Sequence, residues 1–117
     1  MAPQRWNEEQ EIALVSAWQH VKDSPHQINK WYHILQEYNR LVGGSDRTID
    51  SLSRKWNDLN TKCQLFNVYQ YQTLRAVPSD MPEDVTIRYT KREYQSKQRK
   101  EFKHVSAWQM MRDRLNP

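Results

Sequence analysis

Glycine, proline and long apolar runs are all scarce in this sequence of 117 residues. With only 2 Gly and 5 Pro, few residues oppose helix formation. No apolar run approaches the roughly 20 residues that span a bilayer, and the N-terminus has no hydrophobic signal region. We therefore expect a soluble, intracellular protein.

The chain also lacks the patterns of metal centres and common active sites. A lone cysteine, Cys63, excludes an intramolecular disulfide, and we expect it to serve in packing. No histidine has a companion at ligand spacing; the four are His20, His26, His33 and His104. A Gly-rich phosphate loop and a nucleophile elbow are also missing. We expect no metal, no other cofactor and no enzymatic activity.

Apolar residues are present at spacings of three and four, which predicts an all-α fold. The length suits one domain, and 5 Trp with 6 Tyr favour a small aromatic core. A first helix is predicted after Asn7, which can cap it together with Gln10 as in a capping box, and Pro25 breaks the run. Its first turn is acidic, through Glu8, Glu9 and Glu11.

A second helix is predicted over about residues 29–40, with a possible Asn29 cap and with Gly43 and Gly44 at its end. The third begins near Asp46 or Thr48 and runs at least to Lys62. Its apolar side carries Ile49, Leu52, Trp56, Leu59 and Cys63. Its other side carries Asp50, Arg54, Asn57 and Thr61, with Ser53 at the edge.

The chain after Lys62 either extends the third helix or leaves it. The segment "PSDMPEDV", residues 78–85, predicts a boundary, with Pro82 in the first turn of a fourth helix of 14 to 18 residues. That helix has too few apolar residues for deep burial, so we expect it to project from the core. A closing amphipathic helix follows, and its packing residues are Val105, Trp108, Met111 and Leu115.

Charge is distributed unevenly along the chain. Residues 1–60 hold seven Lys and Arg against eight Asp and Glu, a net charge of −1, whereas residues 61–117 hold eleven against six, a net charge of +5. A basic segment spans residues 88–103. It predicts a polyanionic partner or a nuclear import signal, with a solvated helix surface as the alternative.

The tryptophan spacing resembles that of the Myb/SANT family, whose core tryptophans correspond to Trp6, Trp31 and Trp56. The segment "RWNEEQEIAL" is similar to the family's opening, and "RTIDSLSRKWNDL" to its third helix. Three later segments resemble the trihelix-like Myb proteins of PIF/Harbinger transposons and their domesticated plant relatives. They are "FNVYQYQ", "PSDMPEDV" and "KEFKHVSAWQMMRD".

The resemblance implies a three-helix Myb/SANT-type helix-turn-helix bundle over residues 5–62. A two-helix extension over residues 63–117, with the basic segment, would pack on it. It also implies sequence-specific binding of double-stranded DNA through the third helix. The protein would be nuclear, and would act as the DNA-recognition partner of a transposase or as a transcription regulator.

Specific residues follow from the resemblance. The third helix would contact bases through Asp50, Ser53, Arg54 and Asn57. Phosphates would be met by Arg47, Lys55, Lys62, Arg92, Lys97, Arg99 and Lys100. The structural core would hold Trp6, Trp18, Trp31, Leu52, Trp56 and Trp108. The alternative is a SANT-type protein-interaction module that binds a transposase or a histone tail through Glu8, Glu9 and Glu11.

Overall fold

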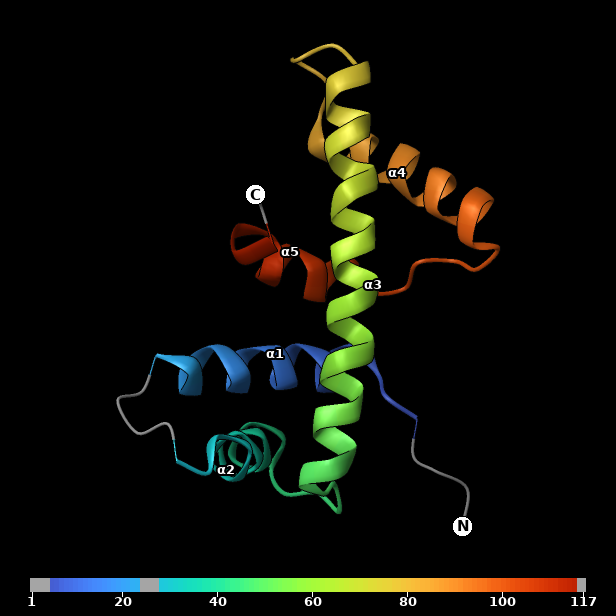
Figure 1. Cartoon of the computed structure of the whole chain (residues 1–117). Helices are drawn as coiled ribbons and strands as arrows, with labels where there is room; N and C mark the ends of the chain where they lie inside the picture. Colours follow the sequence, from blue (N-terminus) through green and yellow to red (C-terminus); the bar gives the residue numbers. More distant parts are fainter. Residues whose placement is uncertain (1–4, 24–27, 116–117) are drawn as a thin grey trace. The chain divides into compact units, whose positions relative to one another are not determined.

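A computed structural model describes residues 5–23 and 28–115 of the chain, and Pro25 and His26 lie outside this part. Every regular element in these residues is a helix, which confirms the all-α prediction. The helices are α1 (Glu8–Lys22), α2 (Lys30–Val42), α3 (Ile49–Ala76), α4 (Glu83–Gln98) and α5 (Val105–Leu115) (Figure 1). None of these helices is long and apolar enough to cross a membrane.

The chain forms two compact units, Met1–Leu59 and Asn60–Pro117. The predicted division lay between residues 62 and 63, close to this boundary. Helix α3 contributes residues to both units, because it continues without interruption to Ala76. Of the two possibilities left open by the sequence, extension of the third helix is therefore the one that the structure adopts.

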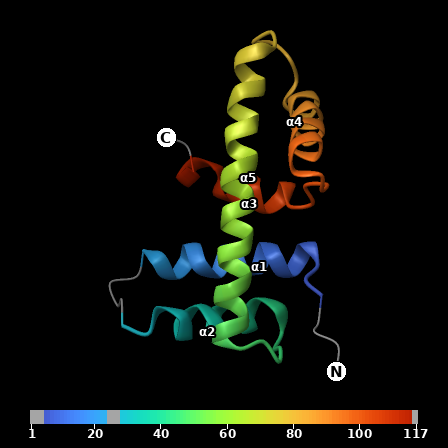
Figure 2. The same cartoon turned by 45° about the vertical axis from the view of Figure 1, so that its right-hand side comes forward.

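In the first unit, α1 and α2 lie side by side, as both views show (Figures 1 and 2). The predicted capping box of α1 is confirmed: the Asn7 side chain accepts from the Gln10 backbone N–H at 2.8 Å, and the Gln10 side chain accepts from the Asn7 N–H at 3.1 Å. The Asn29 cap is wrong, because Asn29 adopts a left-handed conformation and its side chain makes no capping bond. Helix α2 ends at Gly43, whose φ of 80° suits glycine.

The core of the first unit is formed by aliphatic residues together with aromatic pairs, among them Trp18–Trp56 and Trp6–Tyr38, the latter with ring centroids 5.7 Å apart. Trp56 is buried, and its ring stacks on Trp18 with centroids 4.4 Å apart. The ammonium group of Lys30 lies 4.6 Å from the centroid of the Trp18 ring, a cation–π contact. Leu52 is buried as predicted, but Trp6, Trp18 and Trp31 are only half-buried.

The second unit packs α4 beside the C-terminal half of α3 (Figure 2). Helix α4 has 16 residues, as predicted, but the expectation that it projects from the core is wrong. Its buried residues are Thr86, Ile87, Thr90 and Tyr94. The two threonine hydroxyls bond to the buried Gln70 side chain of α3, so polar residues pack at no cost in unmade hydrogen bonds.

An aromatic cluster completes the second unit. Phe66 of α3 stacks on Phe102, which lies between α4 and α5, with centroids 4.0 Å apart, and Trp108 meets Phe66 edge-on at 5.0 Å. The Trp108 indole N–H donates to the Asn67 side-chain oxygen at 3.0 Å. Trp108 and Met111 are buried as predicted, whereas the predicted packing residues Val105 and Leu115 at the two ends of α5 are half-exposed.

Candidate nucleic-acid interface

The first turn of α3 is fixed by reciprocal bonds between Thr48 and Ser51. The Ser51 N–H donates to the Thr48 hydroxyl at 3.1 Å, and the Thr48 N–H donates to the Ser51 hydroxyl at 2.9 Å. The apolar stripe through Leu52, Trp56 and Leu59 then turns inward, since all three side chains are buried. This anchoring leaves the opposite stripe of α3 exposed in the first unit.

The exposed stripe presents Asp50, Arg54 and Asn57. Arg54 Nε lies 3.1 Å from Asp50 Oδ2, one turn earlier, and the two side chains are 80% and 69% exposed. Asn57 is exposed on the next turn. The fourth predicted base-contacting residue, Ser53, is half-buried, and its hydroxyl donates to the backbone oxygen of Asp50 at 3.1 Å. The structure thus brings three of the four side chains together on an open surface.

Lys55 occupies a different place from its neighbour Arg54. Its Nζ lies 3.0 Å from Glu11 Oε2 of α1, and the side chains of Lys55 and Glu11 are only 14% and 7% exposed. The same Nζ lies 5.8 Å from the centroid of the Trp6 ring. A lysine whose side chain is largely buried and whose ammonium group is paired with a carboxylate is poorly placed to contact a phosphate. Glu11 is equally withdrawn from the acidic surface predicted for α1, where Glu8 and Glu9 are exposed.

Arg47 also makes contacts within the first unit. Its guanidinium carbon lies 4.0 Å from the centroid of the Trp6 ring, and Nη2 donates to the Arg5 backbone oxygen at 3.3 Å and to Gln10 Oε1 at 3.5 Å. These contacts join the segment before α3 to the start of α1. Arg47 and Lys55 therefore join the start of α3 to the start of α1. Both contact Trp6; Arg47 also bonds to Gln10, and Lys55 pairs with Glu11.

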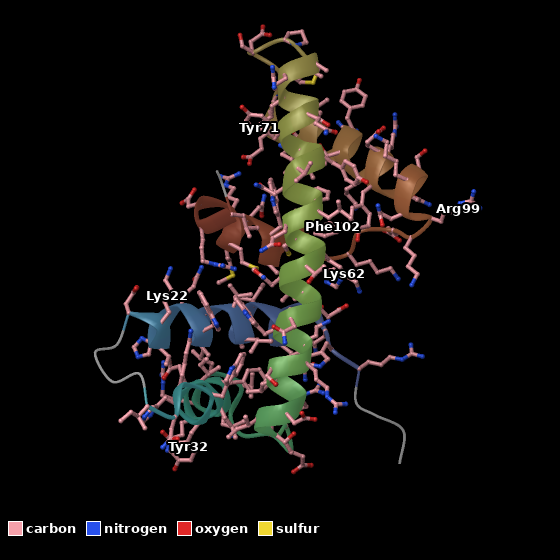
Figure 3. The ribbon with its side chains drawn as sticks, viewed as in Figure 1. Lys22, Tyr32, Lys62, Tyr71, Arg99 and Phe102 are labelled. Atoms are coloured by element: carbon pink, nitrogen blue, oxygen red, sulfur yellow. The ribbon has the colours of Figure 1, made fainter. Side chains whose placement is uncertain are left out.

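The remaining predicted phosphate contacts lie in the second unit. Lys62 is half-buried on α3, and Arg92, Lys97, Arg99 and Lys100 are exposed. Lys97 Nζ lies 2.8 Å from Glu93 Oε1, and the hydrogen bond to this carboxylate raises the pKa of Lys97. Arg99 ends α4 in a left-handed conformation with φ of 59°, and its side chain points outward (Figure 3).

The electrostatic balance differs between these surfaces. On the exposed stripe of α3, the charge of Arg54 faces that of Asp50, and Asp58 adds a second exposed carboxylate. Residues 1–60 as a whole have a net charge of −1. The stripe has donors and acceptors for base edges, but it has no surplus of cations for phosphates.

Local sequence patterns did not reveal the Glu11–Lys55 pair or the Arg47–Trp6 contact. Both join residues that are far apart in sequence, so no helical spacing relates them. The one available signal was the position of Lys55 beside the buried Trp56. Among the described residues, no group of three or more His, Cys, Asp or Glu side chains is placed to hold a metal ion.

Comparison with known proteins bears on the same part of the chain. No curated protein and no solved structure matches the chain. A family model does match residues 13–65, which include most of α1, all of α2 and the first part of α3. The exposed stripe with Asp50, Arg54 and Asn57 lies inside the matched range. Residues 13–65 of this chain are therefore identified as similar to the Myb/SANT-like DNA-binding domain family, in agreement with the tryptophan pattern of the sequence.

Proposed function

We propose that this protein binds double-stranded DNA in a sequence-specific way through the exposed stripe of α3. The observation that carries the proposal is the position of Arg54 and Asn57, which lie open on a helix inside the segment that matches a DNA-binding family. A single α-helix fits the major groove, where each base pair presents a distinct pattern of donors and acceptors. The second unit supplies cations rather than base contacts.

The Asp50–Arg54 pair prepares Arg54 for guanine. The carboxylate accepts from Nε, so the two terminal nitrogens remain for the O6 and N7 atoms of a guanine. An arginine restrained by a neighbour also loses less conformational freedom on binding. Asn57 has the amide geometry that pairs with adenine, and the second oxygen of Asp50 suits a cytosine amino group. Ser53, half-buried at the edge of this stripe, would make a shorter contact.

Phosphate contacts would come chiefly from the second unit. Lys62, Arg92, Lys97, Arg99 and Lys100 provide five cations, whereas Arg47 and Lys55 are engaged inside the first unit. Each phosphate contact releases counterions, so log K decreases as log salt increases. For each cation removed, this negative slope should become shallower by about 0.9. We expect the variant Arg99→Gln, Lys100→Gln to show this reduced slope and the same sequence preference.

We infer the cellular role of the protein from its resemblance to PIF/Harbinger proteins. We place the protein in the nucleus, as a DNA-recognition partner of a transposase or as a transcription regulator. A single Myb-like segment offers few base contacts, so a dimer or a helper protein would be needed for high specificity. Co-purification with a transposase would favour the first role, and failure to co-purify with one would favour the second.

The decisive experiment is selection from a random duplex pool with the wild-type chain and three variants. Arg54→Ala and Asn57→Ala should each erase the preference at one base pair, worth about 1 to 3 kcal/mol of discrimination. Arg40→Ala is the matched control, because Arg40 is also exposed and paired to a carboxylate, Glu37, but lies on α2. An unchanged motif in both test variants would show that another surface reads DNA. No enriched motif with the wild-type chain would refute sequence-specific binding.

A second candidate function rests on the start of α1, where Glu8 and Glu9 are exposed. Two carboxylates on a helix N-terminus suit a basic peptide such as a histone tail, or a basic patch of a transposase. Because Glu11 is paired with Lys55, only Glu8 and Glu9 would take part. Binding of a lysine-rich peptide that is lost in Glu8→Gln, Glu9→Gln, together with no duplex binding, would favour this function.

A further inference from the structure

A row of exposed apolar residues lies on α3 in the second unit. Val68, Tyr71 and Leu74 are 51%, 54% and 51% exposed, and their spacing of three places them along one side of the helix. Figure 3 labels Tyr71, the middle residue of this row. The opposite side of the same turns is buried through Phe66 and Tyr69. Large apolar side chains gathered in this way on a surface indicate a contact site.

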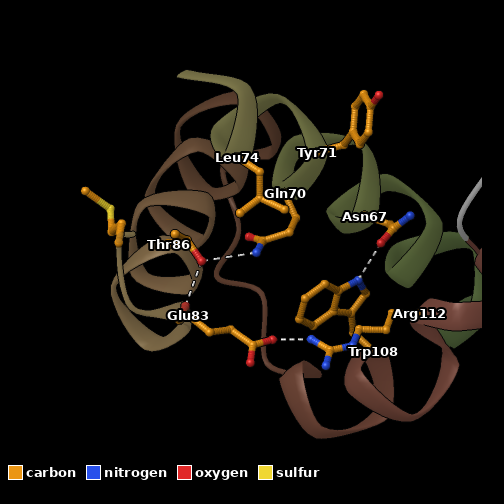
Figure 4. Close-up of a pocket in the computed structure, with 9 residues that line it drawn as sticks. Asn67, Gln70, Tyr71, Leu74, Glu83, Thr86, Trp108 and Arg112 are labelled. Carbon is orange, nitrogen blue, oxygen red and sulfur yellow. Dashed lines mark hydrogen bonds and ion pairs between the residues drawn. The ribbon is translucent and has the colours of Figure 1, made fainter. Parts of the chain in front are cut away.

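Two hollows flank this row. One, of about 430 Å³, lies between α3, α4 and α5, with Leu74 and Tyr71 at its edge and the Trp108 indole at its base (Figure 4). The other, of about 520 Å³, is lined by Val68, Tyr71 and Leu115 among others. Asn67 and Tyr71 line both hollows, so the two hollows are adjacent along α3, and together we call them the groove.

The walls of the groove are held in place by polar contacts. The Trp108 indole N–H bonds to Asn67, and the Gln70 amide bonds to Thr86 (Figure 4). Arg112 and Glu83 form an ion pair that joins α5 to α4 across the first hollow. A groove with such fixed walls needs little reorganisation before a ligand binds, which favours affinity.

The charge of the groove is positive. The second hollow is lined by Arg75 and Arg114, and no Asp or Glu is found among the described residues that line it. The guanidinium of Arg75 lies 5.8 Å from the centroid of the Tyr71 ring, so this charge is next to the apolar row. Among the described residues that line the first hollow, the single carboxylate is Glu83, which is paired with Arg112.

We propose that this groove binds an amphipathic α-helix of a partner protein, with the helix's leucine or aromatic side chains on Val68, Tyr71 and Leu74 and its Asp or Glu residues beside Arg75 and Arg114. The length of the apolar row suits side chains at i, i+4 and i+7 of such a helix. A second copy of this chain is a poorer occupant, because residues 61–117 have a net charge of +5 and would repel themselves. Nucleic acid has no large aliphatic group to cover the row.

The test uses the full chain and three synthetic peptides labelled with fluorescein. The first has leucines at i, i+4 and i+7 with glutamates around them; the second scrambles the same residues; the third replaces each glutamate with lysine. Fluorescence anisotropy gives each Kd, and amide chemical shifts map the bound site. We expect the first peptide to bind at least tenfold more tightly than either control, with shifts confined to the groove.

Variants then assign the contacts. Tyr71→Ser and Leu74→Ser should each weaken binding of the first peptide about tenfold, because these side chains are exposed and the fold does not depend on them. Tyr32→Ser, a half-exposed tyrosine on α2, is the matched control and should change nothing. Duplex binding should also be the same for Tyr71→Ser, which keeps this proposal separate from the DNA proposal.

Three results would overturn the proposal. The first is no saturable binding of the acidic peptide up to about 1 mM. The second is equal binding of the scrambled or lysine peptide, or shifts that map to another surface. The third is sedimentation as a dimer that Tyr71→Ser dissociates, since the groove would then be occupied by a second copy.

Discussion

The ion pair between Lys55 and Glu11 provides the sharpest test of how the first unit is built. Replacing Lys55 with Met keeps the length of the side chain and removes its charge. The Glu11 carboxylate then stays in its withdrawn position without this countercharge. Because the two side chains are only 14% and 7% exposed, water cannot take the place of the lost ammonium group.

The expected loss is about 3 kcal/mol of unfolding free energy, at the lower end of the range for breaking one side of a buried pair. Arg54→Met is the matched control, since Arg54 is the next residue and its pair with Asp50 is 80% and 69% exposed. An exposed pair of this kind contributes at most about 0.5 kcal/mol. The double variant Glu11→Gln, Lys55→Met should recover about 2 kcal/mol, because two neutral partners need no countercharge.

Urea unfolding followed by tryptophan fluorescence measures these differences, since Trp18 and Trp56 stack within the same unit. The reasoning is refuted if Lys55→Met and Arg54→Met have the same stability. A uniform loss of duplex affinity in folded Lys55→Met, with no loss of stability, would instead restore Lys55 as a phosphate contact.

Three further substitutions test the packing. Tyr38→Phe should keep or raise the unfolding free energy by up to about 1 kcal/mol, since the buried Tyr38 hydroxyl has no hydrogen-bond partner within the described part of the chain; a clear loss in urea unfolding would contradict this. Thr90→Val should cost about 1 to 3 kcal/mol by leaving the buried Gln70 amide oxygen without that donor, and an unchanged midpoint would reject the network. Asn7→Ala should cost about 1 kcal/mol through loss of the α1 cap, seen as a lower midpoint of thermal unfolding by circular dichroism; Asn7→Asp, which can still cap, should not.

Several features of the fold were predictable because they depend on neighbours in sequence. The Asn7–Gln10 capping box spans one turn, and Gly43 ends α2 through its own backbone freedom. The exposed position of Arg54 and the burial of Trp56 follow from the helical period alone. The length of α4 was likewise set by local signals, with acidic residues in its first turn; Pro82, which was predicted in that turn, is instead the residue just before the helix.

Other features required the tertiary structure. Thr86 and Thr90 are polar residues in a helix that was not expected to be deeply buried. They can be buried because their hydroxyls form hydrogen bonds with the Gln70 side chain of α3. From the sequence, Lys55 was predicted to be a phosphate contact beside Arg54. In the structure it is largely buried, because it pairs with Glu11 of α1. The groove beside Tyr71 likewise exists only when α3, α4 and α5 are packed together. Local signals act within about one helical turn. The sequence alone therefore determined which segments form helices, and that Leu52, Trp56 and Leu59 share the apolar side of α3. Contacts between helices decided which polar side chains are buried, because only a partner from another helix can satisfy a group removed from water.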